Sequence, residues 1–295
     1  MRYRPFAHSG MAVSALSLIL ADGDRRKPAQ HWRGLLHAAF EAGVNTFEFH
    51  NPSDALLEGF AEAAEPLERR LIFVGLRVAG DRGRQAMAAS VDQVIAKTNL
   101  GSLDLLTIEA TGARSPEIVE EMRALKFARR VRRIALAGDA DAIEGIGEAG
   151  IFDALVTPFN LLSGWRERRL IRAAGDRQLA IIGCDPFPAE TPDLIRNARQ
   201  QQKKGGWFVR REALAGVGSY RFLTDTPGWT AEQICLGYAL TEPSLASVQM
   251  NLAEARQLPP LAAITERDLP PAIGAQIEMA RFSAEQQGAA ARRSA

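Results

Sequence analysis

The stretch RLIFVGLRVAGDRGRQAMAASVDQVIAKTNLGSLDLLTIEAT (70–111) contains the pattern that decides the fold. Its first part, Arg70–Val78, is rich in β-branched and aromatic residues, which is typical of a buried strand. Gln85–Thr98 follows with the pattern of a helix, and Leu103–Thr111 is a second strand-like run. A strand, a helix and a strand in this order predict two parallel strands joined by a crossover helix.

The same alternation extends in both directions along the 295-residue chain. It predicts strands over Val13–Leu20, Thr46–His50, Arg70–Val78, Leu103–Thr111, Val131–Gly138, Ala154–Asn160, Leu179–Phe187 and Leu245–Met250. Eight strand–helix steps in this length favour a closed (β/α)8 (TIM) barrel over an open doubly wound sheet. No Gly-x-Gly-x-x-Gly turn follows the first strand, which counts against a Rossmann domain. We therefore predict an α/β fold with one barrel domain over 1–285 and a disordered tail over 286–295.

Composition and charge narrow the class of protein. The hydrophobic fraction is 46%, the charged fraction is 24%, and the formal net charge is +1. These values are ordinary for a soluble globular protein, and they do not favour a nucleic-acid or membrane partner. Two cysteines, Cys184 and Cys235, cannot form a disulfide framework, so we expect a cytoplasmic protein.

One connection is much longer than the others. Residues 188–228 separate the seventh strand from the next predicted helix, whereas strand-to-helix loops usually have about 2–6 residues. The segment contains the basic polar run RNARQQQKKGG (196–206). Two interpretations remain open: a helix and linker that cover the barrel mouth, or a loop that binds a protein partner.

Several segments resemble the aldo/keto reductase family, in the same order along the chain. They are MRYRPFAHSGMAVSALSL (1–18), HAAFEAGVNTFEF (37–49), LIFVGLRV (71–78), SLDLLTIEA (102–110), RRVRRIALAGDADAIE (129–144), FDALVTPFNLLSG (152–164), IIGCDPF (181–187) and SVQMNLAEARQL (247–258). The resemblance covers nearly the whole chain and is weakest over 188–228. It implies an N-terminal β-hairpin below the barrel, and it points to NADPH-dependent carbonyl reduction as the ancestral activity.

The catalytic residues that the family uses are largely replaced. The resemblance places Glu48 where the family has its Asp, Arg77 where it has Lys, and Glu109 where it has His. The segment that would carry the catalytic Tyr is shortened, and Tyr3, Tyr220 and Tyr238 all lie elsewhere in the sequence. Glu48 and Arg77 can still form an ion pair, but Arg does not readily release a proton as a tuned Lys does. In the family, a Glu in place of the His is associated with reduction of carbon–carbon double bonds.

The cofactor-binding positions of the family are replaced as well. The resemblance places Asp139, Thr157, Cys184 and Asn251 at positions that hold the nicotinamide and the phosphates. It places Glu254 where the family grips the 2′-phosphate, and a carboxylate there would repel a phosphate dianion. We therefore expect no cofactor to be bound in the family manner, with NADP(H) or NAD(H) as the cofactor if activity is retained.

Three functions follow as hypotheses. The first is a non-catalytic binding or regulatory subunit, or a repurposed barrel, that has lost carbonyl reduction. The second is an NAD(P)H-dependent oxidoreductase with an altered site that uses Glu109. The third is a cofactor-independent lyase or isomerase that uses Glu48, Glu109 and Arg77, since carboxylates near strand ends could move protons; His50 also falls near a strand end. The sequence has no metal-ligand spacing motif, so we expect no metal site.

Overall fold

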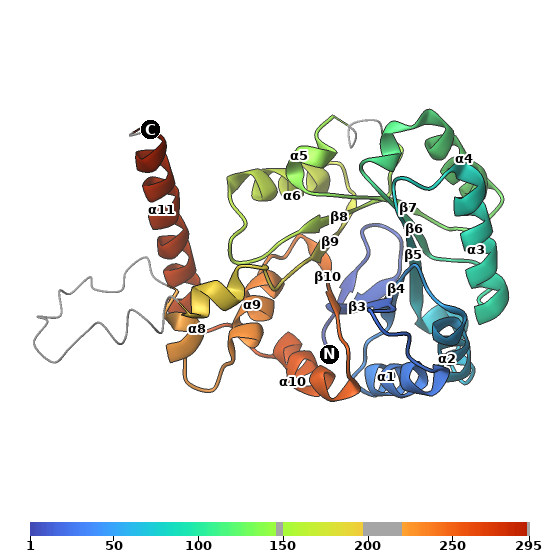
Figure 1. Cartoon of the computed structure of the whole chain (residues 1–295), viewed down its shortest axis with the longest axis horizontal. Coiled ribbons are helices and arrows are strands. Elements are labelled where there is room, and N and C mark those ends of the chain that lie inside the picture. Colours follow the sequence, from blue (N-terminus) through green and yellow to red (C-terminus); the bar gives the residue numbers. More distant parts are fainter. Residues whose placement is uncertain (146–149, 197–219, 294–295) are drawn as a thin grey trace, which may run out of the picture.

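The computed structural model describes residues 1–145, 150–196 and 220–293. Eight parallel strands close into a barrel in the order β10-β3-β4-β5-β6-β7-β8-β9 (Figure 1). Their bounds are β3 Leu16–Ala21, β4 Thr46–His50, β5 Phe73–Val78, β6 Leu105–Glu109, β7 Ile134–Ala137, β8 Ala154–Pro158, β9 Ala180–Cys184 and β10 Leu245–Asn251. The predicted (β/α)8 barrel is therefore confirmed.

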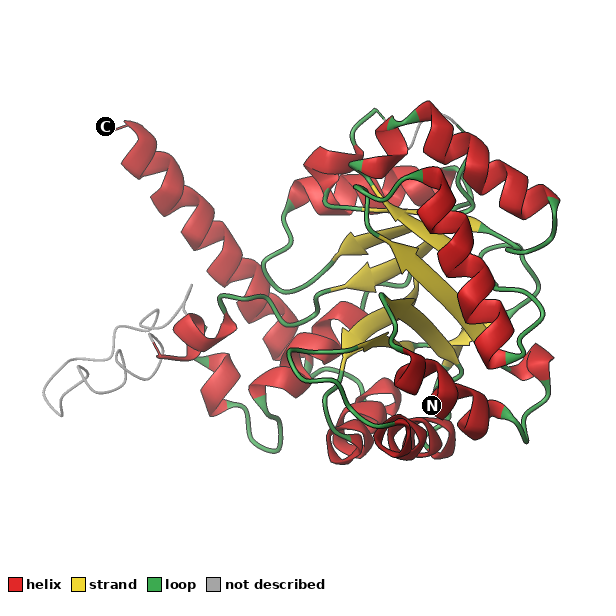
Figure 2. Ribbon diagram, turned by 45° about the vertical axis from the view of Figure 1, so that its right-hand side comes forward, coloured by secondary structure: helices red, strands yellow, loops and turns green. Residues whose placement is uncertain are grey.

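Helices surround this ring of strands (Figure 2). They are α1 Ala29–Glu41, α2 Asp54–Ala64, α3 Arg84–Thr98, α4 Pro116–Phe127, α5 Ala140–Ile143, α6 Trp165–Asp176, α8 Phe222–Asp225, α9 Ala231–Leu240, α10 Leu258–Ala262 and α11 Pro271–Arg293. Side chains such as Leu18, Phe47 and Phe49 project from the outer face of the sheet and pack against the helices. Alternation along each strand sends the next residue into the barrel interior.

A two-stranded hairpin closes the N-terminal end of the barrel. Its strands are β1 (Tyr3–Pro5) and β2 (Ala12–Ser14), which pair antiparallel, and the predicted hairpin is thereby confirmed. Phe6, in the turn of this hairpin, is 1% exposed and belongs to the interior cluster, where its ring centroid lies 4.7 Å from that of Phe73. The interior at the N-terminal ends of the strands, which we call the lower half, is therefore apolar. Polar side chains lie in the upper half, at the C-terminal ends of the strands.

The C-terminal helix is longer than the sequence analysis predicts. α11 runs from Pro271 to Arg293 and extends away from the barrel (Figures 1 and 2). The sequence predicts a disordered tail over 286–295, and α11 includes 286–293, where the Ala, Gln and Arg residues are good helix formers. Among the described residues, no helix is both long and apolar enough to cross a membrane.

The long connection is described only at its two ends. Residues 188–196 and 220–228 are described, and 197–219, which include most of the basic run, lie outside the described residues. Leu194 and Tyr220 pack against the core, and Phe222 and Leu223 are buried within it. Both ends of the connection are thus attached to the barrel.

Candidate functional site

A buried carboxylate organises the polar upper half of the barrel interior. Glu48, on β4, is 3% exposed. Its Oε2 lies 2.8 Å from His50 Nε2 and 3.1 Å from an Arg77 guanidinium nitrogen, and it accepts a 3.0 Å hydrogen bond from Gln249 Nε2. Its Oε1 accepts a 2.5 Å hydrogen bond from the hydroxyl of Thr107. We call Glu48, His50, Arg77, Thr107 and Gln249 the mouth network.

The register of the strands explains why these residues meet. Glu48 pairs with Gly75, and Arg77, two residues further along β5, pairs with Thr107 on β6. Gln249 lies on β10, which closes the barrel against β3. Because interior residues of a barrel stack in layers, the next two strands in the chain, β5 and β6, and the distant β10 deliver donors to one carboxylate.

The surroundings of Glu48 fix its charge. Burial acts to raise its pKa, but the positive charge of Arg77 and the hydrogen bonds from His50 and Thr107 outweigh burial and lower the pKa to about 2. Glu48 is therefore ionised at neutral pH, and its oxygens are occupied by donors. Such a carboxylate orients its neighbours, and it does not itself transfer protons near neutrality.

Arg77 has one donor without a partner. Its guanidinium also donates a 3.2 Å hydrogen bond to Gln249 Oε1, whereas its Nε is buried and makes no hydrogen bond. The expected ion pair between Glu48 and Arg77 is present, at 3.1 Å. A buried unsatisfied donor at a barrel mouth marks a place where a water or a ligand oxygen can accept a hydrogen bond.

Glu109 does not join this network. It ends β6, is exposed, and its Oε2 accepts a 3.3 Å hydrogen bond from the backbone N–H of Gly80. The β5–α3 loop lies so close to Thr111 and Gly112 that only glycine fits at position 80. Glu109 thus bonds to the backbone at the rim of the barrel, and within the described part of the chain its carboxylate makes no hydrogen bond to the residues that contact Glu48.

The four predicted cofactor positions are found in different environments. Asp139 is exposed and caps α5, because its carboxylate accepts a 2.8 Å hydrogen bond from Ala142 N–H. Asn251 is exposed at the end of β10. Thr157 is fully buried, but alternation places it on the outer face of β8, because Val156 packs inside the barrel. Val156 is thus the interior residue of that strand end.

Cys184 faces the interior at the end of β9. Burial raises the pKa of its thiol strongly, and the neighbouring Asp185 acts in the same direction. Its sulfur lies 3.6 Å from a carboxylate oxygen of Asp185. The thiol is therefore protonated at neutral pH, and Cys184 is a poor candidate for a nucleophile.

None of the three tyrosines belongs to the mouth network. Tyr3 lies in the hairpin at the opposite end of the barrel, where its hydroxyl donates to the carbonyl of Gly43 at 2.8 Å. Tyr238 lies on α9 and stacks on Phe159 with ring centroids 6.0 Å apart. The ring of Tyr220 lies 5.8 Å from that of Phe222, in the segment before α8.

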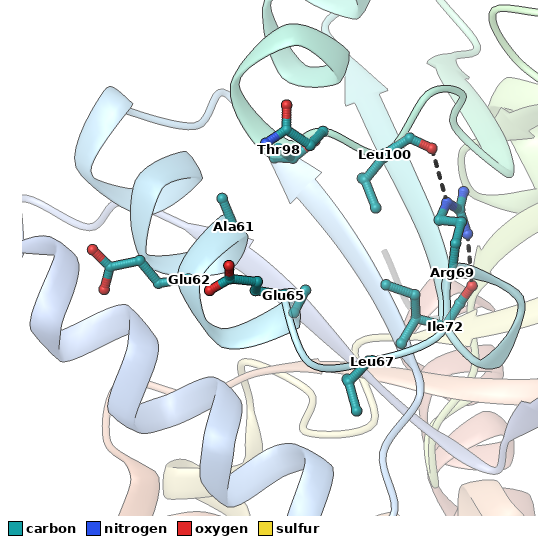
Figure 3. Close-up of a pocket in the computed structure, with 10 residues that line it drawn as sticks. Ala61, Glu62, Glu65, Leu67, Arg69, Ile72, Thr98 and Leu100 are labelled. Carbon is teal, nitrogen blue, oxygen red and sulfur yellow. Dashed lines mark hydrogen bonds between the residues drawn. The ribbon is translucent and has the colours of Figure 1, made fainter.

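Two surface pockets differ in their relation to the mouth. A pocket of about 320 Å³ adjoins the mouth, and its lining includes Asn51, Arg77 and Arg82, with Arg82 donating to Asn51 Oδ1 at 2.7 Å. A pocket of about 410 Å³ lies at the other end, beside the ends of α2 and α3 (Figure 3). Its one basic residue, Arg69, is occupied by the carbonyls of Leu100 and Ile72, so that pocket is a structural depression. Among the described residues, no group of three or more His, Cys, Asp or Glu side chains could hold a metal.

Sequence reasoning missed two members of the mouth network and one contact. Thr107 and Gln249 are not signalled by any motif. His50 was recognised as a strand-end imidazole, but its contact with Glu48 was not anticipated. That contact has a simple signal, because residues two apart on a strand share a face.

Comparisons with known proteins address the fold. No family model matches the chain, and no curated protein matches it. Solved structures do match: the apo form of aldo-keto reductase AKR11C1 from Bacillus halodurans is 15% identical, with a TM-score of 0.69, over 94% of this chain and 95% of that one. The holo form of the same protein gives a TM-score of 0.70 with the same identity and coverage. The chain therefore has the (β/α)8 fold of the aldo-keto reductases, which its own sequence predicts.

Proposed function

We propose that this protein is a repurposed aldo-keto-reductase barrel that has lost NADPH-dependent carbonyl reduction and acts as a binding or regulatory subunit. The main support is the mouth network. Four side chains donate to Glu48 or lie against it, its pKa is about 2, and none of the described tyrosines contacts it. The proton donor and the tunable base of a reductase are both replaced by a closed ionic cluster.

The residues at the cofactor positions do not fit a nicotinamide dinucleotide held in the family manner. The side chain of Gln257 accepts hydrogen bonds from the backbone N–H groups of Ala253 and Glu254, at 3.1 and 2.9 Å. Those backbone donors are thus occupied and cannot hold a phosphate. Glu254 itself adds a negative charge, paired with Lys27 at 3.6 Å, and Asp139 already caps α5. The anionic cofactor would meet carboxylates where it needs donors.

We expect the purified protein to bind neither NADPH nor NADH at millimolar concentration. The measurement is titration followed by nicotinamide fluorescence and by thermal unfolding. A ligand at 100 times its dissociation constant would stabilise the fold by about 2.7 kcal/mol, which a melting curve resolves readily. AKR11C1 from Bacillus halodurans serves as the positive control, and saturable binding by this chain would refute the proposal.

The partner of such a subunit is proposed to bind through residues 188–228. Support comes from the length of this connection and from the packing of both its ends onto the barrel, where Tyr220 and Leu194 contact the core. A partner held there would lie beside α11, because the described end of the connection that contains α8 lies next to the start of α11 (Figure 1).

A second candidate function, cofactor-independent proton transfer, is favoured by one contact. The imidazole of His50 is partly exposed, and its Nε2 rests on the buried carboxylate of Glu48 at 2.8 Å. A carboxylate that orients an imidazole is a recurring arrangement for a general base. In this role His50 replaces Glu109 as the residue that moves the proton, and Glu48 positions it.

This second function predicts hydrogen exchange without nicotinamide. The protein would exchange the carbon-bound protons of dihydroxyacetone or pyruvate in deuterium oxide, followed by proton NMR. His50→Ala should lower that rate about 100-fold or more, since general bases contribute about 10²–10⁴-fold. His37→Ala, in α1, is the matched control and should leave the rate unchanged. If wild-type protein does not exceed the buffer rate, the second function is eliminated.

A further inference from the structure

Two large apolar side chains are exposed at the N-terminal end of the barrel. Phe127, the last residue of α4, is 92% exposed, and Leu71, just before β5, is 55% exposed. The other exposed large hydrophobic side chains among the described residues reach at most 62%. Single exposed hydrophobic residues are ordinary, but their surroundings here are not.

Asp104 links the two segments that carry these residues. Leu103 and Val131 form a bridge between the segments that precede β6 and β7. Arg69 and Arg132, which flank the two sides, both reach the buried carboxylate of Asp104, at 2.8 and 3.2 Å. The segments 69–71 and 127–132 thus each send an arginine to Asp104, at the strand ends opposite the mouth.

Basic residues flank both apolar side chains along the sequence. They are Arg69, Arg70, Lys126, Arg129, Arg130, Arg132 and Arg133. The carboxylates that face them are fewer: Glu68, Asp92, Asp104 and Asp153. Arg129 is exposed, and no carboxylate among the described residues pairs with it; Arg70 keeps an 80% exposed side chain beside Glu68. The overall charge of +1 therefore hides a local excess of positive charge.

Helix capping explains some of these charges but not the whole pattern. Cations at the end of α4 interact favourably with the helix dipole, and several arginines neutralise buried carboxylates. Neither effect accounts for a phenylalanine held in water between Lys126 and Arg129. Apolar side chains ringed by arginines are the arrangement by which surface proteins enter the headgroup region of an anionic bilayer.

We propose that this basal rim, formed by Arg70, Leu71, Phe127, Arg129 and Arg132, is a peripheral docking surface for an anionic lipid bilayer. Phe127 and Leu71 enter the boundary between headgroups and acyl chains, while the arginines contact lipid phosphates. A bilayer is favoured over nucleic acid because Leu71 offers no ring on which a base could stack. The surface lies opposite the mouth, so docking leaves the mouth network accessible.

The test is co-sedimentation with vesicles. Wild-type protein should bind vesicles that contain about one third phosphatidylserine, and not vesicles of phosphatidylcholine alone, and added salt should weaken the binding. Phe127→Ser should lower the partition coefficient about tenfold through lost apolar burial. Arg129→Glu should lower it about tenfold through charge reversal. Both positions are exposed, so thermal unfolding should be unchanged in both variants.

Trp165→Ser supplies the matched control. Trp165 is 61% exposed at the start of α6, on the mouth side, and its loss should leave vesicle binding unchanged. Two results would overturn the proposal: anionic vesicles that bind no protein, or binding that Phe127→Ser leaves intact. A protein that binds a single-stranded oligonucleotide in a Phe127-dependent manner, but not vesicles, would assign the rim to nucleic acid instead.

Discussion

Replacing Glu48 with alanine should lower the free energy of unfolding by about 3–5 kcal/mol, because it leaves the half-buried Arg77 without its counter-ion. Glu48 is 3% exposed, and Arg77, His50, Thr107 and Gln249 all contact its oxygens. Removing it leaves several buried donors unsatisfied at once. The measurement is equilibrium unfolding in urea together with a melting curve, which should fall by about 10 °C.

The control for this change is Glu109→Ala at the same end of the barrel. Glu109 is exposed and contacts only the backbone of Gly80, so its loss should cost about 0.5 kcal/mol or less.

The cost of Glu48→Gln should also depend on pH. The pKa of Glu48 is about 2 in the folded state and ordinary, 4.5, in the unfolded state. A depressed pKa stabilises the fold above pH 4.5 and loses this effect as the pH falls towards 2, so the two proteins should converge in acid. A Glu48→Ala protein as stable as the wild type would show that the network contributes nothing.

Replacing Phe6 with alanine should cost about 3–5 kcal/mol of stability, because it empties the floor of the barrel. Phe6 is 1% exposed, its ring lies 4.7 Å from that of Phe73, and the guanidinium of Arg133 lies 5.9 Å from its centroid. The hairpin is short and cannot follow the void inward, because its backbone pairs Arg4 with Val13. Urea unfolding would measure the loss.

Phe127→Ala is the companion variant for Phe6→Ala. It removes the same side chain from a position that is 92% exposed, so the free energy of unfolding should change by about 0.5 kcal/mol or less. If both variants were equally stable, the hairpin would be a loose appendage and not the floor of the barrel.

The barrel could be predicted because its signal is local and repeated. Thr46–His50 is predicted and observed with the same bounds. In this strand Phe47 and Phe49 alternate with polar residues, and Asn51 and Pro52 follow as a loop. The tail is harder to assign from the sequence, because small polar residues are compatible with both disorder and a helix, and a preceding helix supplies the nucleus. The environment of Thr157 is hard to predict from the sequence, because a shift of one residue along a strand exchanges the two faces of the sheet.

The mouth network could be predicted only in part. The sequence indicated that Glu48 and Arg77 would pair, because both occupy strand ends on adjacent strands. Gln249 comes from a strand about 200 residues further along, and only closure of the ring brings it within 3.0 Å of Glu48. Register across a closed barrel is a property of the whole sheet, so no local window of sequence contains it.

Closure of the ring also has a consequence for how the chain is made. β3 (Leu16–Ala21) is hydrogen-bonded to β10 (Leu245–Asn251). One edge of β3 can therefore pair only after β10 has been synthesised. Ribosomes add about 5–20 residues per second, and the interval therefore lasts on the order of ten seconds or more. During synthesis β3 presents an open edge that could pair with another chain. Cells that make this protein should need a chaperone at the nascent chain until β10 has left the exit tunnel.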